Sequence, residues 1–150
     1  EAKTGILPNV LVVNRRGWVA LKNHPDIVDR IKHTNPNAVT TDQVARLMDL
    51  EDIVVAASVR NTTDEGTTAS VSYICGNHAL LAYRTATPAL DEPASGYTFV
   101  WEGLEGSTDG VAVSTMDMPL KKSTRHEIET AFDMKVVAPL TGVFFQNIVS

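Results

Sequence analysis

The segment Pro8-Asn9-Val10-Leu11-Val12-Val13-Asn14-Arg15-Arg16 decides the fold, because it holds a clear strand and the start of the first helix. Four consecutive apolar residues at 10–13 indicate a strand covered on both faces, since a strand with one wet face would alternate. Asn14 stands where a helix N-cap would stand, ahead of a helix expected at Arg15–Lys22. The sequence therefore predicts a buried strand that leads directly into a helix.

Two more helices and a second strand are expected next. The pair Pro25-Asp26 suits the first turn of a helix, because proline has no N–H to leave unpaired and aspartate complements the helix dipole. Thr40 and Gln43 match a capping box, in which each side chain satisfies an unpaired backbone N–H at the start of a helix that runs to about Asp49. The apolar run Ile53–Ala57 is then the next strand.

The rest of the chain is expected to be mostly strand. Runs at Ala69–Cys75 and His78–Arg84 flank Gly76-Asn77, a pair that favours a β-hairpin turn because it accepts positive φ. Further strands are expected at Tyr97–Trp101, at Val111–Ser114 after a glycine-rich tip at Gly103–Gly110, and within Arg125–Val149 as one long strand and a short final element. The order predicts one mixed α+β domain over residues 1–150, with helices early and sheet late.

Composition excludes several classes of protein. The chain has 150 residues, 43% of them hydrophobic and 21% charged, as in ordinary globular domains. Its apolar runs are far shorter than the ~20 residues of a membrane helix. A net charge of −5 disfavours general nucleic-acid binding, and a single cysteine, Cys75, excludes an internal disulfide and multi-cysteine metal modules. Because the chain starts Glu1-Ala2-Lys3, we expect it to be a piece of a longer protein.

The search for catalytic or metal-binding groups finds little. The four histidines have no metal-binding helical spacing, and His126 should point away from Glu127 on an alternating strand. Cys75 could act as a nucleophile with His78 as its base, but a buried structural thiol is the better interpretation of its strand position. The glycine-rich tip is acidic and lacks the lysine of a phosphate loop. We therefore predict no enzyme, no metal and no cofactor.

Charge is segregated along the chain. Residues 91–117 hold six acids and no base, and the basic stretch Lys121-Lys122 with Arg125 follows. Such segregation is usual for solvated faces; the alternative is that acidic and basic patches meet on neighbouring copies of the chain. The candidate subunit-interface residues are Trp101, Glu102, Glu105, Asp109, Lys121, Lys122 and Arg125.

Taken in order, the motifs resemble the middle and end of tailed-bacteriophage major capsid proteins. The resemblance covers almost the whole chain, and its specificity lies in order and spacing. At the position of Cys75 the family more often has tryptophan. The matching stretches are 8–16 with Trp18, Leu21, His24-Pro25-Asp26 and 29–32; Val44-Ala45-Arg46-Leu47-Met48; Ile53–Val55; Asn61-Thr62; Ile74–Tyr83; Gly96–Trp101; and Lys135–Ala138 with Gly142.

This resemblance implies the shell-protein fold shared with herpesvirus capsid floors and encapsulins. The chain would be a carboxyl-side fragment, with a central mixed or antiparallel sheet flanked by short helices. An axial domain at the capsomer centre would span about residues 24–124, and residues 1–23 and 125–150 would lead from and back to the peripheral domain. The arm, the long hairpin loop and most of the spine helix would lie upstream.

The function implied is that of a structural capsid subunit which self-assembles into hexamers and pentamers around DNA. Its partners would be other copies of itself, and scaffolding, portal or decoration proteins would be further partners. It would bind neither a specific nucleic-acid sequence nor a membrane. It would be made in the bacterial cytoplasm and reside in the virion capsid. The alternatives are a small Cys/His enzyme, and a binding module that uses the Tyr97–Trp101 strand and the acidic loop.

Overall fold

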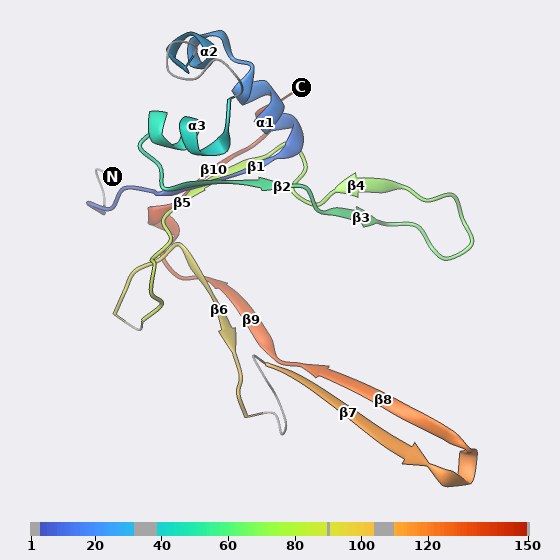
Figure 1. Cartoon of the computed structure of the whole chain (residues 1–150). Coiled ribbons are helices and arrows are strands. Elements are labelled where there is room, and N and C mark those ends of the chain that lie inside the picture. Colours follow the sequence, from blue (N-terminus) through green and yellow to red (C-terminus); the bar gives the residue numbers. More distant parts are fainter. Residues whose placement is uncertain (1–3, 32–38, 90, 104–109, 150) are drawn as a thin grey trace. The chain divides into compact units, whose positions relative to one another are not determined.

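The computed structural model describes residues 4–31, 39–89, 91–103 and 110–149 (Figure 1). The chain divides into two compact units. One comprises residues 1–95 and 138–150, and the other comprises residues 96–137. The first unit holds the helices and a four-stranded sheet, and the second consists of paired strands.

The sheet of the first unit is mixed. Its strands are β1 (Val10–Asn14), β2 (Asp52–Ala56), β5 (Ala79–Ala82) and β10 (Val143–Phe145), in the order β10-β5-β1-β2. Strand β1 pairs with β2 in parallel and with β5 in antiparallel orientation, and β5 pairs with β10 in antiparallel orientation. The helices cover the face of β1 that carries Leu11 and Val13. On the other face Val12 is half-buried and its cross-strand neighbours Val54 and Leu80 are each 39% exposed, so the expected burial of both faces is only partial.

Three helices lie on one side of this sheet (Figure 1). They are α1 (Arg15–Lys22), α2 (Pro25–Ile31) and α3 (Thr41–Leu47), which ends two residues earlier than expected. The predicted caps are confirmed. Asn14 Oδ1 accepts from the N–H of Gly17 at 2.6 Å. The hydroxyl of Thr40 accepts from the N–H of Gln43, whose side chain accepts from the Thr40 N–H in return.

The core lies between these helices and the sheet. Strand register places Val13, Ile53 and Ala79 in this layer, where all three are buried. The helices contribute the remaining buried members of the cluster, which are Trp18, Ile27, Ile31, Val44 and Ala45. Trp18, at 7% exposure, is the aromatic member of this core.

The hairpin predicted across Gly76-Asn77 is wrong. Gly76 has a φ of +56° and lies in a turn, but the strands on either side pair elsewhere. Strand β4 (Val71–Tyr73) pairs with β3 (Val59–Asn61), and β5 joins the main sheet. The carbonyl groups of the turn bind distant partners instead: Gly76 O accepts from Asn14 Nδ2, and Asn77 O accepts from the N–H of Ile148 at 2.9 Å.

The second unit contains two two-stranded ribbons. Strand β6 (Gly96–Val100) pairs with β9 (Phe132–Val136), and β7 (Val111–Met118) pairs with β8 (Ser123–Thr130), all antiparallel. The single long strand expected after Arg125 is wrong, because Ala131 interrupts it. The N–H of Ala131 donates to Gly110 O and its carbonyl accepts from the N–H of Trp101, so this residue joins the two ribbons.

Two short 3-10 helices complete the described structure, at Pro119–Lys121 and Pro139–Thr141. Within the described ranges, no helix is long and apolar enough to cross a membrane. The segment Asn35-Pro36-Asn37, whose asparagine and proline residues predict a turn, lies outside the described residues, and so does most of the glycine-rich tip.

Candidate subunit-contact surface

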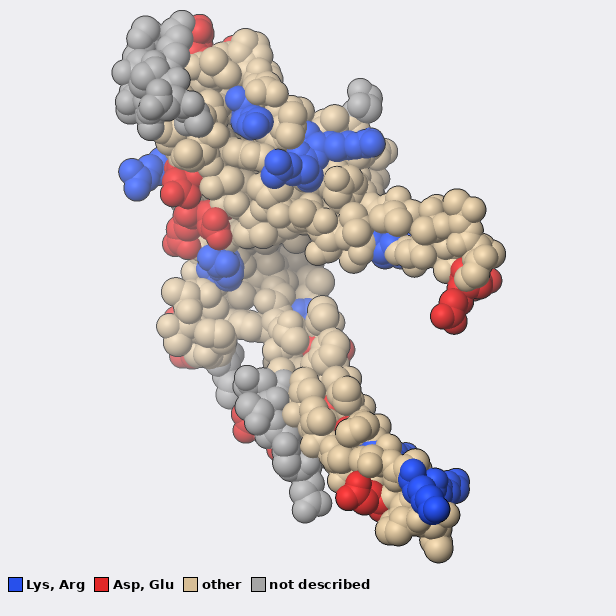
Figure 2. All heavy atoms as spheres, turned by 45° about the vertical axis from the view of Figure 1, so that its right-hand side comes forward, with Lys and Arg blue, Asp and Glu red and all other residues tan. Residues whose placement is uncertain are grey.

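The predicted basic residues Lys121 and Lys122 lie at the end of a long projection, the β7–β8 arm (residues 111–130). The two strands are eight residues each, and the turn between them is the 3-10 helix Pro119–Lys121. Lys122 closes the turn with a left-handed φ of 49°, and its N–H donates to Pro119 O at 3.3 Å. Both lysines are exposed, so the tip presents their charges to solvent (Figure 2).

Arg125 lies on the arm but is already paired. Its guanidinium donates to Glu127 Oε1 at 2.9 Å, and both residues stand on the same face of β8. Exposed ion pairs contribute about 0–1 kcal/mol, so this pair mainly neutralises the charge of Arg125. Asp117, near the tip, accepts a hydrogen bond from the Thr124 hydroxyl at 3.0 Å. Among the described residues of the arm, the lysines Lys121 and Lys122 are therefore the cations without an ion-pair partner.

The arm also carries uncovered apolar side chains. Val113 and Ile128 are directly opposed across the two strands, and they are 67% and 69% exposed. Leu120 at the tip is fully exposed. Isolated two-stranded ribbons are marginal in water, and clustered apolar side chains on such a ribbon are typical of a contact surface.

The β6–β9 ribbon has a more continuous apolar face. Val100 lies opposite Phe132, and Met134 and Val136 follow on the same face of β9. Phe132 is 54% exposed, and Met134 and Val136 are exposed by about seven-tenths (71% and 70%). No neighbouring element among the described residues covers this face, so it is a second surface where a partner would bury apolar area.

Trp101, the exposed aromatic candidate, lies at the end of this ribbon. Its side chain is 63% exposed, while its N–H donates to Ala131 O at 3.1 Å. A Cβ atom on Gly103 would lie 2.6 Å from the indole ring, so the ring lies against the backbone of that glycine. Glu102 beside it is exposed, whereas the candidates Glu105 and Asp109 lie outside the described residues.

Two features of this surface were not predicted from the sequence. The first is that Asp64 and Glu65 form the exposed tip of the hairpin made by β3 and β4, because these strands pair with each other. The acidic composition of 42–65 is visible in the sequence, but the projection depends on strand pairing. Figure 2 shows acidic side chains gathered at the end of this hairpin.

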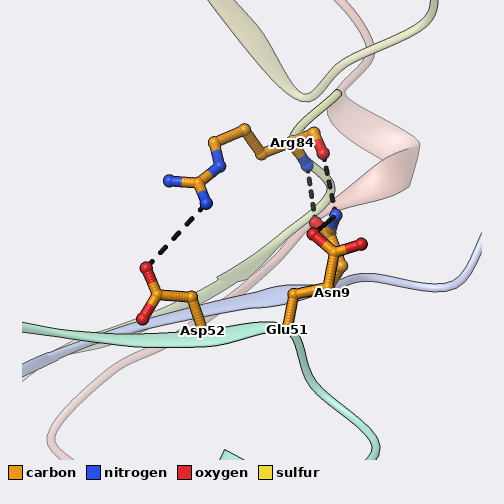
Figure 3. Close-up of polar contacts among 4 residues, drawn as sticks. All are labelled: Asn9, Glu51, Asp52 and Arg84. Atoms are coloured by element: carbon orange, nitrogen blue, oxygen red, sulfur yellow. Dashed lines mark hydrogen bonds and ion pairs between the residues drawn. The ribbon is translucent and has the colours of Figure 1, made fainter. Parts of the chain in front are cut away.

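The second is a polar cluster around Asn9 that holds three strands together (Figure 3). Asn9 Nδ2 donates to Glu51 Oε2 and to Arg84 O, both at 2.8 Å, and Asn9 Oδ1 accepts from the N–H of Arg84 at 2.7 Å. Arg84 also lies 3.8 Å from a carboxylate oxygen of Asp52. The cluster joins the starts of β1 and β2 to the end of β5. The only hint in the sequence is that Asn9, a side chain that both donates and accepts hydrogen bonds, directly precedes the first strand.

His78, His126 and Cys75 have neighbours that suit a structural role. His78 Nδ1 accepts from the N–H of Asn147 at 3.3 Å, and its ring centroid is 5.3 Å from that of Phe144. His126 contacts the Thr115 hydroxyl at 3.3 Å, on the opposite face from Glu127, as predicted. Cys75 is half-buried rather than buried, because β4 ends before it. Among the described residues, no group of three or more His, Cys, Asp or Glu could hold a metal ion.

Comparison with known proteins and solved structures relates the chain to phage proteins. No family model matches the chain. It is 29% identical over an alignment of 110 residues, which covers 69% of the chain, to the major capsid protein of the Burkholderia phage BcepMu. A crystal structure of a phage-related protein from Bordetella bronchiseptica RB50 matches 95% of the chain, with a TM-score of 0.77 and 25% identity.

These matches confirm the resemblance to phage major capsid proteins and the mixed α+β fold. The chain spans 34% of the length of the BcepMu protein and 45% of the Bordetella chain. The whole protein's assembly and partners are therefore matters of proposal.

Proposed function

We propose that this chain is part of a structural subunit of a bacteriophage or prophage capsid shell, which self-assembles into hexamers and pentamers that enclose DNA. The observation that carries the proposal is the sequence likeness to a phage major capsid protein. The structural match over 95% of the chain supports it. In this proposal, about residues 24–124 form the axial domain and the flanking segments lead to the peripheral domain. The protein is made in the bacterial cytoplasm and resides in the virion.

The geometry gives self-association a physical reason. The apolar faces of the β6–β9 ribbon and the β7–β8 arm are exposed in the single chain. Burying apolar surface stabilises by about 25 cal/mol per Å², so neighbouring copies that cover these faces would stabilise both ribbons. The net charge of −5 suits a wall that holds packaged DNA loosely. Scaffolding, portal and decoration proteins are further partners of such a shell.

Electron microscopy and light scattering of the intact natural protein test the proposal. We expect shells, or rings of five and six copies, at micromolar concentration. A protein that stays monomeric at every concentration would contradict the proposal. It would instead favour the second candidate, a monomeric module that binds a partner through Trp101, whose side chain is 63% exposed.

An alanine variant at Cys75 tests the enzyme alternative. Because Cys75 takes no part in the proposed contacts, Cys75→Ala should assemble like the wild type. A hydrolase or transferase activity of the intact protein that this variant abolishes would favour the enzyme.

A further inference from the structure

Two projections of the chain end in opposite charge. The tip of the β3–β4 hairpin (residues 59–73) carries Asp64 and Glu65, and the tip of the β7–β8 arm carries Lys121 and Lys122. All four side chains are exposed, and none forms an ion pair with another described residue. Figure 2 shows acidic side chains at the end of the hairpin, and basic side chains at the end of the arm with acidic ones beside them.

Each projection also has an apolar patch between its tip and its root. On the β3–β4 hairpin, Val59 lies directly opposite Tyr73, and Val71 is on the same face. The two valines are 53% and 59% exposed, and the tyrosine is 38% exposed. On the β7–β8 arm the patch is the opposed pair Val113 and Ile128. Neither patch is covered by another described element.

We propose that the β3–β4 hairpin of one copy packs against the β7–β8 arm of a neighbouring copy. The two tips lie together, so that Asp64 and Glu65 face Lys121 and Lys122. The proposal rests on the proposed function, because it needs neighbouring copies of the chain. The contact is heterologous, since each copy offers its hairpin to one neighbour and its arm to the other, and contacts of this kind form rings when the rotation between copies closes.

The order of the features determines the direction of packing. On both projections the charged pair is at the tip and the opposed apolar pair is nearer the root, while the arm tip also exposes Leu120. With the tips together, acidic groups meet basic groups and apolar patch meets apolar patch. With the tips opposed, charged groups would face apolar side chains and lose hydration without gaining a partner. Complementary charge selects the register, and the apolar patches supply buried area.

Charge reversal and its compensation test the contact in the intact natural protein. The acidic variant is Asp64→Lys with Glu65→Lys, and the basic variant is Lys121→Glu with Lys122→Glu. Each alone should reduce the assembled fraction more than about tenfold, because like charges then face each other. The fourfold variant restores opposite signs and should regain assembly. Arg15→Glu with Arg16→Glu, a pair of exposed residues at the start of α1, is the control and should assemble normally.

A disulfide measures the contact directly. In a Cys75→Ser background, chains with Glu65→Cys are mixed with chains with Lys121→Cys and oxidised. Lys121 is chosen because Lys122 has a left-handed φ that a cysteine would strain further. A mixed dimer that needs both cysteines supports the contact. Efficient bonding between Asn61→Cys and Lys121→Cys would indicate another register and overturn it.

The two hypotheses fail differently. If the wild type assembles and both charge-reversed variants assemble equally well, the contact is wrong and the capsid function stands. If the wild type never self-associates, the proposed function itself is wrong.

Discussion

The hydroxyl groups of Ser95 and Thr141 lie 2.9 Å apart, and they join the segments that lead into and out of the strand-rich unit 96–137. The Thr141 hydroxyl donates to Ala138 O at 2.7 Å, so it accepts its second hydrogen bond from Ser95. The Ser95 oxygen in turn accepts from the N–H of Tyr83 at 2.9 Å. Since Thr141 is only 5% exposed, water cannot readily replace this chain of bonds.

Thr141→Val should destabilise the helix-bearing unit. Valine has nearly the same shape but no hydroxyl, so the half-buried Ser95 hydroxyl loses its acceptor. The expected loss in the free energy of unfolding is about 1–3 kcal/mol, measured by urea denaturation. Thr68→Val, at an exposed position in the same unit, is the control and should change stability by less than about 0.5 kcal/mol. Equal stability of the two variants would show that the hydroxyl pair contributes nothing.

Asn14 should be among the least replaceable polar residues. It is fully buried, caps α1 and donates to Gly76 O, so Asn14→Ala removes both interactions. We expect a loss of about 2–3 kcal/mol in thermal or urea unfolding. Asn14→Ser keeps a good cap but is too short to reach Gly76, and should lose only about 1 kcal/mol. A serine variant as damaged as the alanine variant would show that capping is unimportant here.

Gly110→Ala should destabilise the junction of the two ribbons. Gly110 has a φ of +73°, and a Cβ there would lie 2.5 Å from Val100 Cγ1 and 2.8 Å from Ala131 O. Gly66, with a φ of +88° and nothing within 4 Å of such a Cβ, is a matched control for backbone strain alone. Each alanine should lower the free energy of unfolding by about 1–2 kcal/mol, because an L-residue is strained at positive φ. Gly110→Ala should lower it by about 1–3 kcal/mol more, because the added Cβ overlaps Val100 and Ala131. Hydrogen exchange of the strand amides measures both, and equal effects would contradict the packing argument.

Met134→Gln should weaken self-association while leaving the fold of the chain intact. Met134 is 71% exposed on the apolar face of the β6–β9 ribbon, so the change costs less than about 0.5 kcal/mol in the isolated chain. Sedimentation of the intact protein should show fewer assembled particles. The control is Lys135→Gln on the opposite face of β9. If both variants assemble like the wild type, this face is not a contact surface.

The candidate site was predicted in part from the sequence. The sequence picks out Lys121, Lys122 and Trp101 as candidates by charge and side-chain type, and the structure shows all three exposed, with the two lysines at a tip. Arg125 differs, because Glu127 on the same strand face pairs with it. The acidic tip at Asp64 and Glu65 was missed as a site, because nothing near these residues in the sequence shows that β3 and β4 pair.

Local chemistry alone specifies the helices and their caps. The hydrogen bonds of Asn14 with Gly17 and of Thr40 with Gln43 span three residues, so the residues that make them can be read from the chain itself. Strand pairing is different, because an alternating or apolar run fits any partner strand equally well. Gly76-Asn77 could have closed a hairpin. Its backbone binds Asn14 and Ile148 instead, and only the packed structure brings those partners, 62 residues or more away, to the turn.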